Sequence, residues 1–169
     1  MSIRRLLGLV LLWCWATASG AAADKPKPFV AGSMQEVVTS HAGQPFVFAL
    51  WSLTCVHCKA NLDMFNRLRA RHPELSLVLV STDTTDDAAA IDATLKRHGL
   101  ANVPSWVFSD TIVERLRFEI DRRWRGELPR TYFYDAGHPV RAVSGKLEEA
   151  EIERWLQSLP GARQKEHSN

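Results

Sequence analysis

Apolar residues in the first half of the chain come in short unbroken runs, and these runs predict buried strands. One run extends from Phe46 to Trp51, and another, rich in leucine and valine, extends from Leu75 to Ser81. A continuous apolar run of this length is typical of a strand that is covered on both faces of its sheet. A shorter run over residues 103–108 predicts a third strand of the same kind.

Between and after these runs, apolar residues recur at the three- and four-residue spacing of an amphipathic helix. Helices are therefore expected over residues 33–41, 55–71, 86–98, 110–124 and 147–159. Ser33 is expected to cap the first of them, with Glu36 in the capping-box position. Two further strands, over residues 132–134 and 140–143, flank a turn that contains Gly137 and predict a hairpin.

The order of these elements predicts an α/β fold with a mixed central sheet and helices on both faces. Strands that alternate with helices favour parallel pairing through helical crossovers, whereas the closing hairpin adds antiparallel strands. A chain of 169 residues has room for one packed domain, which we place at residues 33–160. Residues 24–32 are expected to form a flexible lead-in, and residues 161–169 a polar tail.

Residues 1–23 have the pattern of an export signal. Arg4 and Arg5 precede an apolar stretch over residues 6–18, and small residues follow it as far as Ala23. We therefore expect cleavage before Asp24 and a domain that is periplasmic or otherwise exported. The apolar stretch is shorter than the roughly 20 residues that span a bilayer, and an uncleaved membrane anchor is the alternative.

Removal of this segment changes both the charge and the cysteine count. The whole chain has a formal net charge of +2 and three cysteines. The segment takes with it Arg4, Arg5 and Cys14 and no acidic residue, so a neutral chain with two cysteines remains. Without a strong excess of positive charge, nucleic-acid binding is not expected. In an oxidising compartment, a single cysteine pair is a candidate redox centre.

The two remaining cysteines, Cys55 and Cys58, open the helix that follows the strand ending at Trp51. Unsatisfied N–H groups and partial positive charge at a helix N-terminus stabilise a thiolate. Cys55 is therefore the candidate nucleophile, and Cys58, one turn deeper on the same side, is the candidate resolving thiol. Such a pair needs no cofactor beyond its own disulfide. A structural disulfide and half of a zinc site are the alternatives.

Two segments carry a resemblance to a known family. The residues Trp51-Ser-Leu-Thr-Cys55-Val-His-Cys58-Lys59 resemble the active-site segment of the thioredoxin superfamily, and the residues from Leu128-Pro129 to Gly137 resemble its cis-proline segment. The long interval between Cys55 and Pro129 fits the TlpA-like branch, which contains exported thiol-disulfide oxidoreductases with an added segment in the middle of the fold.

The resemblance implies a thioredoxin-like fold, a cis Leu128–Pro129 bond packed against the disulfide, and exchange of disulfides with protein substrates. The Leu128 backbone would offer a short edge on which an extended substrate could pair, with Trp51 as a second substrate contact. The resemblance also implies a partner protein, membrane-bound or not, that resets the Cys55–Cys58 pair.

Several positions depart from the family pattern. Ala49 stands where thioredoxins carry a buried acid that assists proton transfer at the second cysteine, and Glu127 and Glu36 are candidate replacements for it. Thr54 replaces the tryptophan that usually precedes the first cysteine, and Arg130 follows the proline where many relatives have threonine.

His57 makes the direction of electron flow an open question. The TlpA-like branch favours a reductase, whereas a histidine just before the second cysteine stabilises the Cys55 thiolate and favours a DsbA-like disulfide donor or isomerase. A solvated His57 with little influence is the simpler alternative. Two functions of other classes are also open: Cu(I) binding by Cys55, Cys58 and His57 in a metalloenzyme assembly pathway, and a non-catalytic partner-binding module.

Arginines gather around the helix that leads to the proline segment. They are Arg115, Arg117, Arg122, Arg123, Arg125 and Arg130. This cluster predicts either a docking face for an acidic partner or a solvated helix surface. Trp106, Trp124 and Trp155 are expected in or beside the core.

Overall fold

The structure is a computed structural model that describes residues 26–135 and 138–159. The expected export signal lies outside these ranges, as do the polar tail and the two central residues of the hairpin turn. Within the described ranges, no helix combines the length and the apolar character that a membrane span needs.

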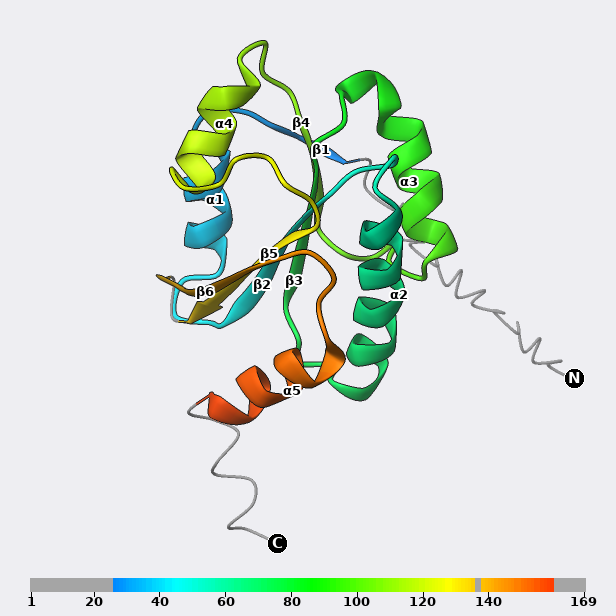
Figure 1. The fold of residues 1–169 in the computed structure, drawn as a ribbon, viewed down its shortest axis with the longest axis vertical. Coiled ribbons are helices and arrows are strands. Elements are labelled where there is room, and N and C mark those ends of the chain that lie inside the picture. The colour runs from blue at the N-terminus through cyan, green and yellow to red at the C-terminus, as the bar shows by residue number, and fades with distance from the viewer. Residues whose placement is uncertain (1–25, 136–137, 160–169) are drawn as a thin grey trace, which may run out of the picture.

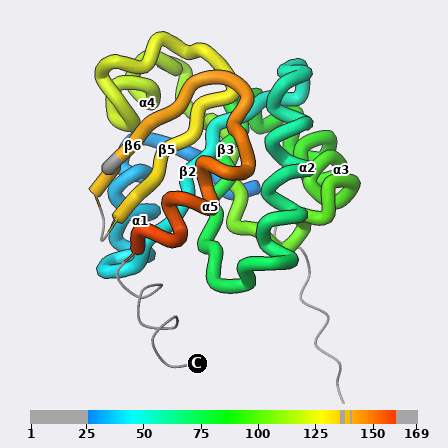
Figure 2. Tube along the Cα trace, turned by 60° about the horizontal axis from the view of Figure 1, so that its bottom comes forward, coloured from blue at the N-terminus to red at the C-terminus, as the bar shows by residue number. Residues whose placement is uncertain are grey.

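Six strands form one mixed sheet in the order β1-β4-β3-β2-β5-β6. They are β1 Lys27–Phe29, β2 Phe46–Trp51, β3 Leu77–Ser81, β4 Ser105–Phe108, β5 Arg130–Asp135 and β6 His138–Ser144. The first four strands in this order pair in parallel, whereas β5 is antiparallel to β2 and to β6. The predicted mixed sheet and closing hairpin are therefore confirmed (Figure 2).

Helices cover both faces of this sheet, as predicted. They are α1 Ser33–Ser40, α2 Val56–Arg71, the 3-10 turn η1 Thr85–Asp87, α3 Ala88–Arg97, α4 Val113–Ile120 and α5 Glu149–Ser158. Helices α1 and α4 pack on one face, and α2, α3 and α5 pack on the other (Figure 1). Two apolar cores result, one on each side of the sheet.

The central strand β2 explains why its sequence has no polar position. Its side chains alternate between the two cores, and all of them are buried. Val47, Ala49 and Trp51 face the core beneath α2, whereas Phe46, Phe48 and Leu50 face the core beneath α1 and α4. Because both faces are covered, the strand gains from apolar side chains at every position.

The N-terminal boundary of the domain differs from the expectation. Residues 27–29, expected to belong to a flexible lead-in, form β1 and pair in parallel with β4. The Phe29 side chain is fully buried, with its ring centroid 5.7 Å from that of Phe108 and 6.0 Å from that of Trp106. Burial of this ring holds the segment on the sheet, and an edge strand tolerates the adjacent Pro28.

The start of α1 also differs from the expectation. Ser33 does not cap the helix, because its hydroxyl accepts a hydrogen bond from the Val30 N–H instead. The cap is the carboxylate of Glu119 in α4, which accepts from the N–H groups of Gly32 at 3.0 Å and Met34 at 3.2 Å. A carboxylate from a distant helix thus satisfies donors that local sequence rules assign to a neighbouring side chain.

The burial of Phe29 yields the first prediction. Replacement of Phe29 with alanine should lower the free energy of unfolding by about 3–5 kcal/mol, because it empties a fully buried ring site. Urea unfolding monitored by circular dichroism measures this value. The nearby Val30, whose side chain is 42% exposed, provides the matched control, and V30A should cost less than about 1 kcal/mol. Equal effects of the two changes would contradict a structural role for β1.

Candidate active site

The cysteine pair lies where the central strand passes into helix α2. Strand β2 ends at Trp51, and Cys55 is the N-cap residue of α2. Cys55 and Cys58 form a disulfide with their Cα atoms 5.3 Å apart. Cys58 is 1% exposed and belongs to the core beneath α2, whereas Cys55 is only partly buried. A reacting partner can therefore reach the Cys55 sulfur more easily than the Cys58 sulfur.

The backbone at this helix end is directed at the Cys55 sulfur. The Cys58 N–H donates a hydrogen bond to Cys55 Sγ at 3.1 Å, and the first turn of α2 contains no acidic residue. Once the disulfide is reduced, the same N–H group and the positive end of the helix stabilise a thiolate at Cys55. The roles of Cys55 as nucleophile and Cys58 as resolving thiol stay predictions.

The two residues between the cysteines are open to solvent. Val56 is 76% exposed, and His57 is also exposed. Together with the partly buried Cys55, they form a small surface of apolar and ionisable character at the start of α2. His57 therefore lies where its charge can act on Cys55 and where a docked protein can contact it.

The segment from Leu128 to Pro129 lies at the same end of the sheet. The Leu128–Pro129 peptide bond is cis, as the resemblance implies. Leu50 of β2 pairs with Arg130 of β5, so Pro129 lies beside the end of β2 that leads to the cysteines. Pro129 is buried and its carbonyl accepts from the Gly145 N–H at 2.8 Å, whereas Leu128 is partly exposed and packs against both cores.

Trp51 occupies a different environment from the one expected of a substrate contact. Its side chain is 2% exposed and packs in the same core as Cys58. The ring therefore belongs to the core that contains Cys58 and does not form part of the molecular surface. We retain Leu128, and not Trp51, as a residue placed to contact a substrate.

Neither candidate replacement for the missing acid is placed to serve Cys58. Ala49 faces the core that contains Cys58, with Thr131 as its partner on β5. Glu36 lies on α1, which covers the opposite face of the sheet. The Glu127 carboxylate is engaged elsewhere, since it accepts from the Ser144 hydroxyl at 2.8 Å and from the Arg125 N–H at 3.1 Å.

A carboxylate that the sequence analysis did not single out holds the loop before Cys55. Asp83 follows β3 and accepts hydrogen bonds from the Ser52 hydroxyl and the Leu53 N–H, each at 2.9 Å. The Ser81 hydroxyl donates to it at 2.5 Å. The carboxyl ends of neighbouring parallel strands lie at the same edge of a sheet. An acidic residue just after β3, the parallel neighbour of β2, was therefore the signal in the sequence that could have identified Asp83.

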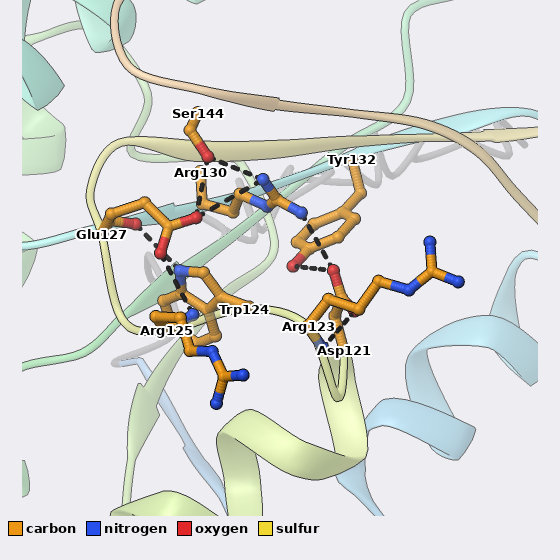
Figure 3. A network of polar contacts seen from close by, with 8 residues as sticks. All are labelled: Asp121, Arg123, Trp124, Arg125, Glu127, Arg130, Tyr132 and Ser144. Carbon is orange, nitrogen blue, oxygen red and sulfur yellow. Dashed lines mark hydrogen bonds and ion pairs between the residues drawn. The ribbon is translucent and has the colours of Figure 1, made fainter.

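Arg130, the first residue of β5 after Pro129, lies in a network of polar contacts (Figure 3). Its guanidinium donates to the Asp121 carboxylate at 2.9 Å and to the Ser144 hydroxyl at 2.6 Å, and lies 3.5 Å from the Glu127 carboxylate. The Tyr132 hydroxyl also donates to Asp121, at 3.2 Å. These contacts tie the loop after α4, which ends at Ile120, to strands β5 and β6.

The charges in this network favour one another. Partial burial raises the pKa of Asp121, but hydrogen bonds from the Arg123 N–H, Arg130 and Tyr132 outweigh it and hold that pKa below its usual value. Hydrogen bonds and the charge of Arg130 likewise outweigh burial and lower the pKa of Glu127. The pKa of Tyr132 is raised, chiefly by burial, so its hydroxyl stays a donor.

The arginine cluster is largely engaged within the molecule. Besides Arg130, Arg115 lies 3.8 Å from the Asp110 carboxylate. Arg117 lies over the ring of Trp124, and Arg122 lies 4.7 Å from the ring centroid of Phe118. These contacts favour the interpretation of the cluster as a helix surface and leave less positive charge for an acidic partner. Trp106, Trp124 and Trp155 are buried, as expected.

The metal-binding alternatives require several donor side chains that lie close together. Among residues 26–135 and 138–159, no three or more His, Cys, Asp or Glu side chains are gathered in an arrangement that could hold a metal ion. Cys55, Cys58 and His57 therefore do not form such a group. A cavity of about 280 Å³ lies between α2 and the segment before α5, and no cysteine lines it.

Comparison with solved structures identifies the architecture. A secreted disulfide oxidoreductase of Mycobacterium tuberculosis, homologous to E. coli DsbE, superposes with a TM-score of 0.57 at 20% identity, over 72% of this chain and 86% of that one. StoA from Bacillus subtilis superposes with a TM-score of 0.53 at 18% identity, over 68% and 84%. The exposed lipoprotein thioredoxin Etrx1 of Streptococcus pneumoniae gives 0.55 at 20% identity, over 72% and 90%.

The chain has a thioredoxin-like fold. No family model matches its sequence, and no curated protein is similar enough in sequence to be matched. Of these neighbours, the Mycobacterium tuberculosis protein is described as a disulfide oxidoreductase and Etrx1 as a thioredoxin. In this chain the fold places a disulfide at the start of α2. The similarity at this level of identity establishes the fold.

The network around Arg130 yields the second prediction. A carboxyl whose pKa is lowered by folding stabilises the protein above its unfolded pKa of about 4, and this contribution is lost as pH falls through the folded pKa. Asp121→Asn should therefore lower the free energy of unfolding by about 1–3 kcal/mol near pH 7 and weaken its decline toward about pH 3. Urea unfolding across this pH range measures both effects.

Glu114→Gln is the matched control, because Glu114 is an exposed carboxylate on α4, the helix that Asp121 follows. It should leave both the stability at neutral pH and its pH dependence close to those of the unmodified protein. If Asp121→Asn behaves like Glu114→Gln, the network does not stabilise the proline segment.

Proposed function

We propose that this protein is an exported thiol-disulfide oxidoreductase that acts on protein thiols and disulfides through Cys55 and Cys58. The observation that carries this function is the position of the disulfide. A reachable sulfur at the N-terminus of a helix is paired with a buried one, at the end of the sheet that also carries a cis proline. A purely structural disulfide has no need of a helix terminus that stabilises one thiolate.

In the reducing direction, the reaction begins with both cysteines reduced. The Cys55 thiolate attacks one sulfur of a substrate disulfide, which breaks that bond, releases one substrate thiolate and forms a mixed disulfide. Cys58 then loses its proton and attacks the Cys55 sulfur, and the second substrate thiolate leaves. Two electrons have passed to the substrate, its two thiolates take up protons, and Cys55–Cys58 is oxidised.

Binding of an extended polypeptide is supported by the segment before the proline. Leu128 is partly exposed and lies at the end of the sheet where β2 leads to the cysteine pair. An extended substrate could pair with the Leu128 backbone as an added strand, which would bring its disulfide to Cys55. The exposed Val56 provides an apolar contact on the helix side of the same surface.

Export is supported by the N-terminal pattern and by the neighbours. Residues 1–23 read as a signal, and the solved neighbours include a secreted enzyme and an exposed lipoprotein. An oxidising compartment would return Cys55 and Cys58 to the disulfide, so a reductase working there needs a partner that supplies electrons. Such a partner can be membrane-bound.

A disulfide donor is the second candidate, and the position of His57 favours it. The exposed His57 lies in the first turn of α2, between the two cysteines. A positive charge there stabilises the Cys55 thiolate, which makes the disulfide more oxidising. The reduction potential distinguishes the two directions. A value near about −270 mV indicates a thioredoxin-like reductant, and a value near about −120 mV indicates a DsbA-like oxidant.

The cysteine roles yield the third prediction. With reduced Cys58→Ser, a protein disulfide substrate such as insulin should become trapped as a mixed disulfide at Cys55, because no resolving thiol remains. Cys55→Ser should trap at least tenfold less, since the remaining thiol is buried. Non-reducing electrophoresis and mass spectrometry of the adduct measure both. The unmodified protein is the control and should reduce insulin without accumulating a mixed disulfide, whereas equal trapping by the two active-site variants would refute the assigned roles.

The fourth prediction concerns His57. Replacement with alanine should lower the reduction potential by up to about 30 mV, because it removes a group that stabilises the reduced form, and a tenfold change in the equilibrium corresponds to about 30 mV. Equilibration with a glutathione series measures the potential. Val56→Ala is the control at the neighbouring exposed position. A His57→Ala potential equal to that of Val56→Ala would show that His57 is only a solvated surface residue.

A further inference from the structure

We propose that Asp83 is a positioning residue for the redox centre, and that it holds the reduction potential of Cys55–Cys58 low through the loop it anchors and the charge it carries. This inference rests on the proposed thiol-disulfide exchange and bears on its direction. Asp83 lies outside the Cys-x-x-Cys motif and outside the proline segment, after the end of β3.

The carboxylate of Asp83 is used at both of its oxygens. Oδ1 accepts from the Ser52 hydroxyl at 2.9 Å, and Oδ2 accepts from the Leu53 N–H at 2.9 Å and the Ser81 hydroxyl at 2.5 Å. Ser52 and Ser81 are themselves buried. Two of these hydrogen bonds, from Ser52 and Leu53, therefore tie the loop after β2 to the end of β3, and the third, from Ser81, holds the carboxylate in place.

The same loop carries the backbone contact of Cys55. The Ser52 carbonyl accepts from the Cys55 N–H at 3.2 Å, and the Ser52 hydroxyl accepts from the Thr54 N–H at 3.3 Å. Ser52 thus links Asp83 directly to Cys55, the N-cap residue of α2. Movement of this loop would change how Cys55 faces the helix N-terminus, and with it the stabilisation of its thiolate.

The charge of Asp83 acts against that stabilisation. Within the described residues, Asp83 forms no ion pair with a lysine, arginine or histidine, and its hydrogen-bond donors are neutral groups. It contacts the N–H of Leu53, two residues before Cys55, so its charge lies within roughly 10 Å of the reactive sulfur. A negative charge at that distance disfavours a second one, which destabilises reduced, ionised Cys55.

Asp83→Asn removes the negative charge of this side chain but keeps its hydrogen bonds to the loop before Cys55. The asparagine oxygen can still accept from the Leu53 N–H and the Ser81 hydroxyl, and its amide can donate to the Ser52 hydroxyl. The loop contacts are thus retained while the negative charge is lost. Asp83→Ala removes both. Asp86→Asn is the matched control, because Asp86 is an exposed carboxylate three residues further along the chain.

The experiment measures the pKa of the Cys55 thiol from the pH dependence of its alkylation in the reduced protein, and the equilibrium with glutathione. Asp83→Asn should lower the pKa of Cys55 by roughly 0.3–1 unit. It should also shift the glutathione equilibrium toward reduced protein by up to about tenfold, which is about 30 mV. Asp86→Asn should change neither, and Asp83→Ala should in addition lower the thermal midpoint.

The outcomes separate this inference from the proposed function. If Asp83→Asn matches Asp86→Asn in both the Cys55 pKa and the glutathione equilibrium, the proposed role of Asp83 is overturned, even where Asp83→Ala unfolds at a lower temperature. If the unmodified protein exchanges no disulfide with insulin or glutathione, the proposed function fails. The alkylation measurement still decides in that case whether Asp83 acts on Cys55.

Discussion

Strand β2 lies at the centre of the sheet with every side chain buried, and the chain must leave the sheet where this strand ends. The exit occurs at Ser52, and the next helix begins at Val56 with Cys55 as its cap. Both cores contribute to this constraint, because a shift of β2 along its neighbours by one residue would exchange the side chains between them. The position of the redox pair is therefore a consequence of the packing of the whole sheet.

Two polar networks hold the segments that meet at this end of the sheet. Asp83 anchors the loop before Cys55 from the end of β3, and Arg130 anchors the segment that follows the cis proline. The two networks differ in charge. Arg130 is paired with Asp121 and Glu127, whereas the donors to Asp83 among the described residues are all neutral. The first arrangement stabilises the structure, and the second leaves a negative charge close to the reactive sulfur.

Regular elements were predictable because their signals are local. The unbroken run of β2 and the helical spacing after Cys55 each identify an element without knowledge of its neighbours. Contacts between distant segments were not predictable in this way. The cap of α1 comes from Glu119, and the strand β1 depends on burial of Phe29 against rings of other strands. The sequence could not show whether Trp51, next to the Cys-x-x-Cys motif, is buried or exposed, because its burial also depends on contacts between distant segments.

By itself, the sequence determined the order of strands and helices from β2 onward, and the place of Cys55 and Cys58 at a helix N-terminus with a spacing that allows them to pair. It could do so because spacing along the chain decides which residues share one turn of a helix. Only the tertiary structure decided which carboxylate contacts the loop before Cys55. Asp83, and not Glu127 or Glu36, lies beside the cysteine loop, because parallel strands that are distant in sequence end at the same edge of the sheet.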